Sequence, residues 1–380
     1  MKKLAIITTH PIQYYSPVFK LLHQRQQIEI KVFYTWGEGA MNKFDPGFGK
    51  TVQWDLPLLD GYPYEWVINT SKNPGSHSFN GIVNPGLIQQ IKNYAPDAIL
   101  IYGWAYASHL KVLRYFKNKM PVIFRGDSTL LRKEDAFKAL LKFALLRWIY
   151  THIDRVLYVG TNNKAYFKKY GLKEQQLSFA PHAIDNERFA QKRDDEAKAL
   201  RDVLGLNDND ILILFAGKFE DIKSPFLLLD AFQSINKKNV HLLLVGNGAL
   251  ENELKLKAAD NPNIHFMGFQ NQSYIPVVYQ ACDLFCLPSK SETWGLAINE
   301  AMVCQKAVIS SDKVGCAIDL IIPGSNGAIF KESSLADLVL QLNNLVGKNT
   351  DGLKSMGKSS KQIIDDWNFE KQAQAIEKAV

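Results

Sequence analysis

The chain has 380 residues, longer than a single hydrophobic core usually grows, so two domains of roughly 150 to 200 residues each are expected. Hydrophobic residues make up 46% of the sequence and charged residues 22%, without long apolar runs, which predicts a soluble globular protein and excludes a membrane-spanning helix. The net charge of +7 is uneven: residues 1–190 hold 25 Lys and Arg against 14 Asp and Glu, whereas residues 191–380 hold 20 against 24. A basic first half suits an anionic partner such as a phospholipid surface, a phosphorylated acceptor or nucleic acid.

Apolar runs of strand length alternate with helical patterns along the first half. The chain starts with two lysines and the run LAII, which is too short for the core of a signal peptide, so this run is predicted to be the first strand. The later predicted strands are IEIKVFYTW, AILIYG, PVIFRGD, RVLYVG and LSFAPH, and the predicted helices are PVFKLLHQ, ASHLKVLRYF, AFKALLKFALLRWIY and NKAYFKKYG. This alternation predicts βαβ units and a parallel sheet.

The same rhythm restarts after a charged segment, residues 191–210. The predicted strands are ILILFAGKF, HLLLVGNG, IHFMGF, LFCLPS and AVISSD, and the predicted helices are SPFLLLDAFQSI, ENELKLKAADN, IPVVYQACD and LAINEAMVCQ. The pattern predicts an α/β protein with two Rossmann-like, doubly wound parallel-sheet domains, residues 1–190 and 205–365, that meet near residues 185–210. Because open α/β sheets bind ligands at the carboxyl ends of their strands, substrates are expected in a cleft between the domains.

Residues 42–80 break this rhythm and are rich in glycine, proline and aromatic residues. Long irregular segments in a compact domain are often binding loops, so contact with an acceptor is one interpretation. The other interpretation is an insertion without a role in binding.

The four cysteines, Cys282, Cys286, Cys304 and Cys316, lie among apolar neighbours and lack the spacing of a metal site or redox motif. They are predicted to be packed free thiols rather than disulfides or zinc ligands. A reducing cytoplasm fits this use of cysteine.

The stretch SETWGLAINEAM, residues 291–302, follows the predicted strand LFCLPS and enters a predicted helix. Gly295 has no side chain, so a phosphate can approach the N–H groups at the start of this helix. Glu292 precedes the helix and Glu300 lies on its second turn. A carboxylate accepts hydrogen bonds from two hydroxyls at once, so the pair suits the vicinal diols of a ribose and a sugar. The alternative is a pair of ordinary exposed helix charges.

A second loop follows the predicted strand ILILFA and contains Gly217, Lys218 and Lys223. At the carboxyl end of a strand, the two ammonium groups can neutralise a diphosphate without a metal ion. The alternative is that both lysines are solvated loop charges. No metal site is expected, because the D-x-D sequence at residues 208–210 precedes a strand instead of following one.

Residues 279–312, together with FAGKF, LLLVGNG and IHFMGF, resemble the donor half of retaining family-4 glycosyltransferases of the GT-B fold, also described as glycosyl transferases group 1. The resemblance covers most of residues 205–330 and depends on two glutamates with seven residues between them in a strand–loop–helix context. It implies that residues 205–365 bind a nucleotide-sugar donor and residues 1–190 an acceptor. It also implies that a C-terminal helix, about residues 366–380, crosses back to the first domain.

The resemblance also implies a role for each matching residue. Glu300 would bind the ribose hydroxyls of the nucleotide, and Glu292 the hydroxyls of the donor sugar. The N–H groups around Gly295 and Leu296 would bind the diphosphate.

The loop with Gly217, Lys218 and Lys223 would contact the diphosphate and stabilise the leaving nucleoside diphosphate. Lys218 stands where the family more often has arginine, which keeps the charge and loses the bidentate geometry. A second departure is Gln305-Lys306, where the family usually places a glycine before the next strand.

Candidates in the first half lie at the predicted strand ends. His10, Arg125 and Asp127 are candidate catalytic residues, because the family often carries a sugar-contacting histidine where this chain has Arg125, and Asp127 or His10 can take its place. His182 and His109 are weaker candidates, and His109 is alternatively a satisfied histidine on a surface helix. The glycine pair that the family carries after its first strand is absent.

The predicted helix AFKALLKFALLRWIY carries Lys138, Lys142 and Arg147 on a largely apolar segment. A basic amphipathic helix of this kind can lie on an anionic membrane surface. The alternative is a core helix whose lysines form its solvated face.

Together with these observations, the resemblance implies a glycosyltransferase of the hexosyltransferase type that needs no metal ion or cofactor, and retention is implied by the resemblance alone. Its donor is a nucleoside-diphosphate sugar and its acceptor a glycan or lipid-linked molecule, as in envelope polysaccharide synthesis. The expected location is cytoplasmic, with a peripheral position on the inner face of the cell membrane as an option. The alternatives are a nucleotide-sugar epimerase or hydrolase of the same fold, and an inactive scaffold subunit.

Two other classes are excluded on the sequence. A nicotinamide-binding loop would need a third glycine after Gly246 and Gly248, where this chain has Glu251. Nucleic-acid binding would need a basic patch interleaved with aromatic residues.

Overall fold

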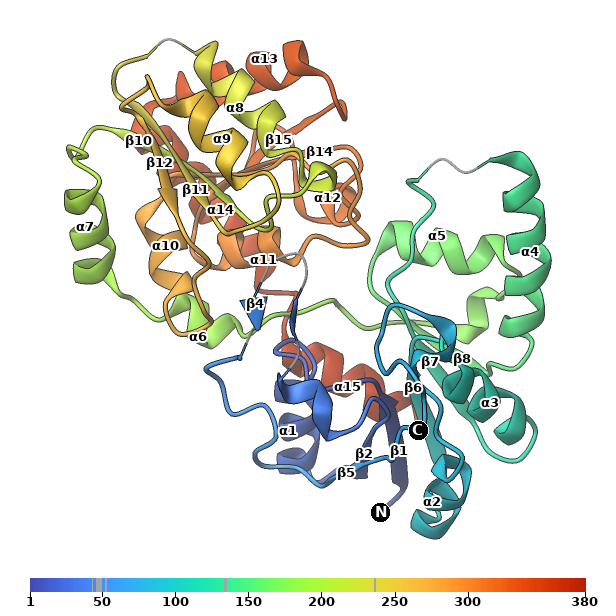
Figure 1. Cartoon of the computed structure of the whole chain (residues 1–380). Helices are drawn as coiled ribbons and strands as arrows, with labels where there is room; N and C mark the ends of the chain where they lie inside the picture. The colour runs from blue at the N-terminus through green and yellow to red at the C-terminus, as the bar shows by residue number, and fades with distance from the viewer. Residues whose placement is uncertain (43, 46–49, 52, 133–134, 236) are drawn as a thin grey trace. The chain divides into compact units, whose positions relative to one another are not determined.

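The computed structural model describes residues 1–42, 44–45, 50–51, 53–132, 135–235 and 237–380. It divides into two compact units. Unit 1 consists of Met1–Lys43, Pro57–His182 and Phe369–Val380, and unit 2 consists of Phe44–Leu56 and Ala183–Asn368. Each unit contains a parallel sheet with helices on both faces (Figure 1).

Unit 1 is built on a seven-stranded sheet in the order β5-β2-β1-β6-β7-β8-β9. Every neighbouring pair in it is parallel. The strands are β1 (Lys3–Thr8), β2 (Glu29–Tyr34), β5 (Tyr64–Trp66), β6 (Ala98–Tyr102), β7 (Val122–Arg125), β8 (Arg155–Tyr158) and β9 (Leu177–Phe179). Central strands such as β1 and β6 are buried along almost their whole length, which explains why they are continuous apolar runs in the sequence.

Successive residues of a strand point to opposite faces, so β1 serves two hydrophobic cores in unit 1. Ala5 and Ile7 pack with residues from α2, α3, α4 and α5, whereas Leu4 and Ile6 pack with residues from α1 and α15. The helices of unit 1 are α1 (Ser16–Arg25), α2 (Leu87–Tyr94), α3 (Ala107–Phe116), α4 (Ala136–Tyr150), α5 (Thr161–Lys169), α15 (Phe369–Ala379) and the short 3-10 helices η1 (Glu38–Asn42), η2 (Phe79–Gly81) and η3 (Glu174–Gln176). The last helix, α15, is fixed to α1 because Arg25 donates two hydrogen bonds to the Glu377 carboxylate, at 2.7 and 2.9 Å.

Unit 2 is built on a six-stranded sheet in the order β12-β11-β10-β13-β14-β15, also entirely parallel. The strands are β10 (Ile211–Ala216), β11 (Val240–Val245), β12 (Ile264–Met267), β13 (Leu284–Leu287), β14 (Ala307–Ser311) and β15 (Gly327–Phe330). The helices are α6 (Asn186–Ala190), α7 (Asp194–Val203), η4 (Asp221–Lys223), α8 (Pro225–Gln233), α9 (Glu251–Ala258), α10 (Ile275–Ala281), α11 (Leu296–Val303), α12 (Ala317–Leu320), α13 (Leu335–Val346) and α14 (Asn349–Ile364).

Numbered along the chain within unit 2, the strand order is 3-2-1-4-5-6, the order of the dinucleotide-binding Rossmann fold. Unit 1 follows the same order with a seventh strand added at one edge. The prediction of two Rossmann-like parallel-sheet domains is therefore confirmed. The edge strands β5 and β15 were not predicted, because they have only three and four residues and lack a long apolar run.

The irregular stretch at residues 42–80 is shared between the two units. Residues 43, 46–49 and 52 of this stretch lie outside the described residues. Phe44–Leu56 belongs to unit 2, where the Asn271 side chain donates to the Gln53 carbonyl at 2.8 Å and the Ser273 amide donates to the Asp55 carboxylate. The sequence assigned these residues to the first domain, because contacts between segments so far apart leave no local pattern.

Within the part of the chain that the structure describes, no helix is long and apolar enough to cross a membrane. The four cysteines are free and buried, and burial raises the pKa of the Cys282 thiol to about 12. They therefore pack as hydrophobic residues.

Candidate functional site

Two loops of unit 2 meet at the point where the strand order reverses. β10 and β13 are neighbours in the sheet, although β11 and β12 lie between them in the sequence. The helices that follow these two strands lie on opposite faces of a sheet of this kind, which opens a crevice at the carboxyl ends of the strands. The loops that follow β10 and β13, together with helix α11 after the second loop, contain the predicted residues of the second half.

The loop between β13 and α11 has a backbone course that requires glycine at Gly295. This residue has φ +98°, and a Cβ atom there would lie 2.7 Å from Val314 Cγ1. The loop is also held to the segment after β14, because the Glu292 amide donates to the Lys313 carbonyl at 3.0 Å and the Gly315 amide donates to the Glu292 carbonyl at 3.2 Å. These contacts fix the N-terminus of α11 at the end of β13.

Glu292 and Lys223 are brought together from the two loops. The Lys223 ammonium forms an ion pair with Glu292 Oε1, and the Ser289 hydroxyl donates to the same oxygen at 2.9 Å. Both charged side chains are half-buried, with exposed fractions of 26% for Lys223 and 15% for Glu292. The loops are joined again by the Lys290 amide, which donates to the Ile222 carbonyl at 2.8 Å.

Glu300 lies on the second turn of α11 and is buried, and its Oε2 accepts a hydrogen bond from the hydroxyl of Tyr279 on α10 at 2.8 Å. Tyr279 is itself buried. The interaction holds the carboxylate in one orientation on the helix.

Gly217 and Lys218 begin the loop after β10. The Gly217 amide donates to the Val245 carbonyl at 2.9 Å, and a Cβ atom on Gly246 would lie 1.9 Å from the Gly217 carbonyl oxygen. The glycine at residue 246 therefore serves the close packing of two strand-end loops. Lys218 is half-buried at this position, on the same loop as Lys223.

In unit 1, His10 follows β1. Its Nδ1 lies 2.8 Å from the Thr9 hydroxyl, and its ring makes an edge contact with Trp36. His10 thus lies at the carboxyl end of a central strand, as predicted.

The side chain of Arg125 is buried, and its guanidinium donates to the Ala180 and Pro181 carbonyls at 2.9 and 3.0 Å. These bonds join the end of β7 to the segment after β9. A guanidinium turned onto two backbone carbonyls supports the fold of unit 1, which favours a structural role over the catalytic one predicted for Arg125.

Asp127 lies near a cluster of aromatic rings in unit 1, in which Tyr102 and His182 are buried and Tyr15 is partly buried. The ring of Tyr15 contacts Tyr102 at a centroid distance of 4.7 Å and stacks on His182 at 6.1 Å. Burial and the nearby Asp127 carboxylate raise the pKa of Tyr15. Burial and the positive charge of Arg125 lower the pKa of His182 to about 3, so this imidazole is neutral near pH 7.

His109 is a satisfied core residue. Its Nε2 lies 2.8 Å from the Thr35 hydroxyl and its Nδ1 lies 2.9 Å from the Gly103 carbonyl oxygen. Its ring nitrogens have partners, as in the alternative of a satisfied histidine, but the side chain is fully buried and does not lie on the surface of α3.

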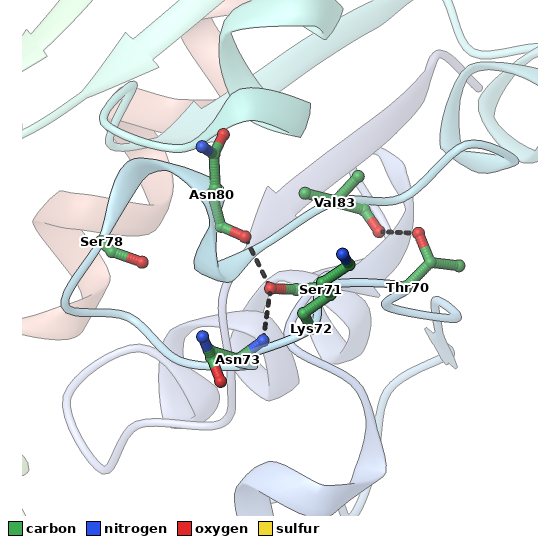
Figure 2. Close-up of a pocket in the computed structure, with 7 residues that line it drawn as sticks. All are labelled: Thr70, Ser71, Lys72, Asn73, Ser78, Asn80 and Val83. Atoms are coloured by element: carbon green, nitrogen blue, oxygen red, sulfur yellow. Dashed lines mark hydrogen bonds between the residues drawn. The ribbon is translucent and has the colours of Figure 1, made fainter.

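A polar pocket of about 320 Å³ lies on unit 1 beyond β5 (Figure 2). Thr70 and Ser71 are held in its wall by hydrogen bonds to the carbonyls of Val83, at 3.2 Å, and of Asn80, at 2.6 Å. The lining consists of Thr70, Ser71, Lys72, Asn73, Ser78, Asn80 and Val83, and all of these except Val83 carry a hydroxyl, amide or ammonium group. A pocket of this kind suits a polyhydroxylated or anionic ligand.

Sequence reasoning missed two residues that orient the glutamates. Ser289 contacts Glu292 and Tyr279 contacts Glu300. Tyr279 lies 21 residues before its partner on a different helix, so no local spacing indicates the pair.

Comparison with known proteins places this architecture among glycosyltransferases. Residues 196–363 match the family model of glycosyl transferases group 1. D-inositol 3-phosphate glycosyltransferase of Segniliparus rotundus is 31% identical over 157 residues, which covers 38% of this chain and 34% of that protein. Alpha-galactosylglucosyldiacylglycerol synthase of Streptococcus pneumoniae is 22% identical over 245 residues, covering 60% of this chain and 62% of that protein. The matches thus span less than two thirds of either relative.

Among solved structures, Anabaena HepE in complex with UDP has a similar fold, with a TM-score of 0.75 and 18% sequence identity. The alignment covers 100% of this chain and 99% of HepE. Further crystal structures of HepE hold UDP with glucose and UDP-glucose. Residues 196–363 of this chain are therefore similar to glycosyl transferases group 1, and the whole chain has the GT-B fold of two Rossmann-like units.

Proposed function

We propose that this protein is a glycosyltransferase that moves a hexose from a nucleoside-diphosphate sugar to an acceptor bound by unit 1, with retention and without a metal ion. The observation that carries the proposal is the meeting of Lys223 and Glu292 at the switch point of unit 2, beside the N-terminus of α11. A carboxylate, an ammonium group and a helix N-terminus in one crevice match the three parts of such a donor: sugar hydroxyls, diphosphate charge and phosphate oxygens.

Lys223 is the central cation in this proposal. An ammonium group has three N–H donors, so Lys223 can keep its contact with Glu292 and still donate to a phosphate oxygen. As the bond between the sugar and the diphosphate breaks, negative charge grows on the leaving group, and a cation already positioned there stabilises the transition state. Lys218 on the same loop adds a second positive charge.

Glu292 and Glu300 are proposed to bind opposite ends of the donor. Oε1 of Glu292 pairs with the Lys223 ammonium and accepts a hydrogen bond from Ser289. Oε2 of Glu292 is the proposed acceptor for hydroxyls of the sugar. Glu300 is oriented by Tyr279 through Oε2, and its other oxygen is the proposed acceptor for the ribose hydroxyls. The positive end of the α11 dipole and the first N–H groups of that helix hold the diphosphate between them.

Unit 1 is the proposed acceptor side. Its polar pocket beyond β5 presents groups that hydrogen-bond to hydroxyls or phosphate, and it includes Lys72. The excess of basic residues in the first half also suits a phosphorylated or anionic lipid-linked acceptor. The names of the relatives agree with such acceptors, since one acts on inositol 3-phosphate and the other makes a glycosylated diacylglycerol. Envelope glycan synthesis on the cytoplasmic side is the process that this chemistry fits.

The first experiment is calorimetric titration of the purified protein with UDP, GDP and ADP, followed by UDP-glucose, because HepE holds UDP and UDP-glucose. One diphosphate should bind with micromolar affinity, and added chelator should leave both binding and transfer unchanged. The product of transfer should keep the anomeric configuration of the donor, which NMR of the glycosidic proton measures.

Three outcomes would overturn parts of the proposal. Absence of binding by every nucleotide would favour the scaffold alternative. Release of the nucleotide at the full rate without an acceptor would indicate a hydrolase or epimerase. Loss of transfer on chelation would contradict the metal-free mechanism.

A further inference from the structure

Helix α4 of unit 1 exposes a row of large apolar side chains. The exposed fractions are 68% for Phe137, 65% for Leu140, 57% for Leu141, 46% for Leu145 and 42% for Trp148. Single exposed hydrophobic residues are common on protein surfaces, but five on one short helix form a continuous patch.

The spacing of these residues places them on one side of α4. An α-helix turns by about 100° per residue, so residues 137, 140, 141, 145 and 148 fall within an arc of about 140°. Leu146, Ile149 and Tyr150 lie outside this arc and are buried in the core of unit 1, where Tyr150 packs on Phe167 of α5. Helix α4 therefore has one apolar face for the core and a second one that faces outward.

Basic residues border the outward face on both sides. By the same geometry, Lys138 follows Leu145 on one flank and Arg147 precedes Leu140 on the other. Both residues are exposed. On the neighbouring helix α3, the Arg114 guanidinium lies over the ring of Trp148 at 5.5 Å. The sequence had left open whether the lysines form the solvated face of a core helix, and the structure shows that the middle of this face is apolar.

We propose that α4 docks unit 1 on an anionic phospholipid bilayer, with Phe137, Leu141, Leu145 and Trp148 in the acyl boundary and Lys138 and Arg147 at the lipid phosphates. A helix of 15 residues is about 22 Å long, which is too short to span a bilayer but sufficient to lie in the plane of its interface. Tryptophan and long basic side chains suit that interface, because each combines an apolar body with a polar end.

A second copy of the chain is a less suitable occupant of this face. A two-fold pairing through α4 would bring Lys138, Arg147 and Arg114 of one copy near the same residues of the other. Residues 1–190 hold 25 basic against 14 acidic residues, so such a pair would join two positively charged surfaces. An anionic bilayer instead complements the basic border and covers the apolar row.

The test is co-sedimentation of the full chain with vesicles of phosphatidylcholine, alone or mixed with phosphatidylglycerol. The wild-type protein should bind the mixed vesicles and lose binding in high salt. Leu141→Gln should weaken binding at least about tenfold, whereas Leu256→Gln, which changes a still more exposed leucine on α9, should not. Each charge removed near anionic lipid weakens binding about fivefold, so Lys138→Glu should weaken it more than the matched Lys358→Glu on α14.

A fluorescent label locates the contact without relying on any activity. The four native cysteines are buried, so Leu145→Cys introduces a single accessible thiol for a polarity-sensitive dye. Its emission should shift to the blue with anionic vesicles, and that of a Leu256→Cys control should not. The proposal would be overturned if the wild-type protein failed to bind the mixed vesicles, or if Leu141→Gln and Leu256→Gln lost vesicle binding equally. It would also be overturned, in favour of a second copy, if the protein were a dimer that Leu141→Gln converts to a monomer. The readouts are independent of sugar transfer, so an inactive enzyme that binds vesicles would leave the docking proposal intact.

Discussion

Substitution of Glu300 tests the donor site at the residue whose surroundings the structure defines best. Glu300 Oε2 accepts a hydrogen bond from the Tyr279 hydroxyl at 2.8 Å, and a carboxylate has further lone pairs that can accept from a ligand. A hydrogen bond to a charged group contributes about 1.5 to 3 kcal/mol, which corresponds to about 10- to 150-fold in affinity. Glu300→Ala should therefore weaken binding of the preferred nucleoside diphosphate about ten- to a hundredfold.

The same substitution also affects stability, and the two effects can be separated. Glu300→Ala removes the Glu300 acceptor from the hydroxyl of Tyr279, a side chain only 1% exposed, which should lower the free energy of unfolding by about 1 to 3 kcal/mol. Tyr279→Phe in the Glu300→Ala background removes that hydroxyl. The double variant should recover much of the stability while its nucleotide affinity stays weak, because the two effects have different physical causes.

Isothermal titration calorimetry measures the affinity, and urea unfolding without ligand measures the stability. Glu300→Gln keeps an acceptor for Tyr279 and removes the charge, so it should weaken nucleotide binding without a large loss of stability. Glu253→Gln, at an exposed position on α9, is the matched control and should change neither quantity. Unchanged nucleotide affinity in the Glu300→Ala variant would refute the assignment to the ribose.

Three further predictions concern the neighbouring loops and unit 1. Lys223→Met should lower turnover at saturating donor by about tenfold or more. The control Lys290→Met changes a lysine paired with the exposed Asp221 and should not lower turnover. Equal steady-state rates for Lys223→Met and the wild-type protein would remove Lys223 from the mechanism. Gly295→Ala should lower the free energy of unfolding by about 2 kcal/mol, because φ is +98° and the new Cβ would meet Val314, and an unchanged urea midpoint would contradict this backbone course. The pKa of His182 falls from 6.5 to about 3 on folding, so the unfolded chain binds a proton at a higher pH than the folded chain does. The free energy of unfolding should therefore decrease as the pH falls from about 6.5 toward 3. Urea unfolding between about pH 7 and pH 5 measures this slope, which His182→Gln should reduce.

Much of the fold could be predicted because parallel strands are recognisable one at a time. β1, β6, β10 and β11 are buried on both faces, so each is a continuous apolar run wherever it lies in its sheet. Helix α4 could likewise be bounded from the sequence, since Ala136–Tyr150 is the segment AFKALLKFALLRWIY. The order of the strands in each sheet has no such local signal in the sequence. Only the strand pairing in the structure shows this order.

The candidate site shows the same division. The sequence indicated that Glu292, Glu300 and Gly295 form one group, because they lie within a single strand–loop–helix segment. Lys223 is 69 residues from Glu292, and only the adjacency of β10 and β13 brings the two into contact. The position of Arg125 at a strand end suggested a catalytic role, but the sequence could not show where its side chain points. Its guanidinium is turned inward onto two backbone carbonyls.

By itself, the sequence determined the type of each domain and the chemistry available at its strand ends, because apolar periodicity and residue type are local properties. Only the tertiary structure decided which strand ends are neighbours, which charged groups are paired and which side of α4 faces outward. Those features depend on contacts between residues that are distant in the chain, and burial in a fold is set by all neighbouring elements together.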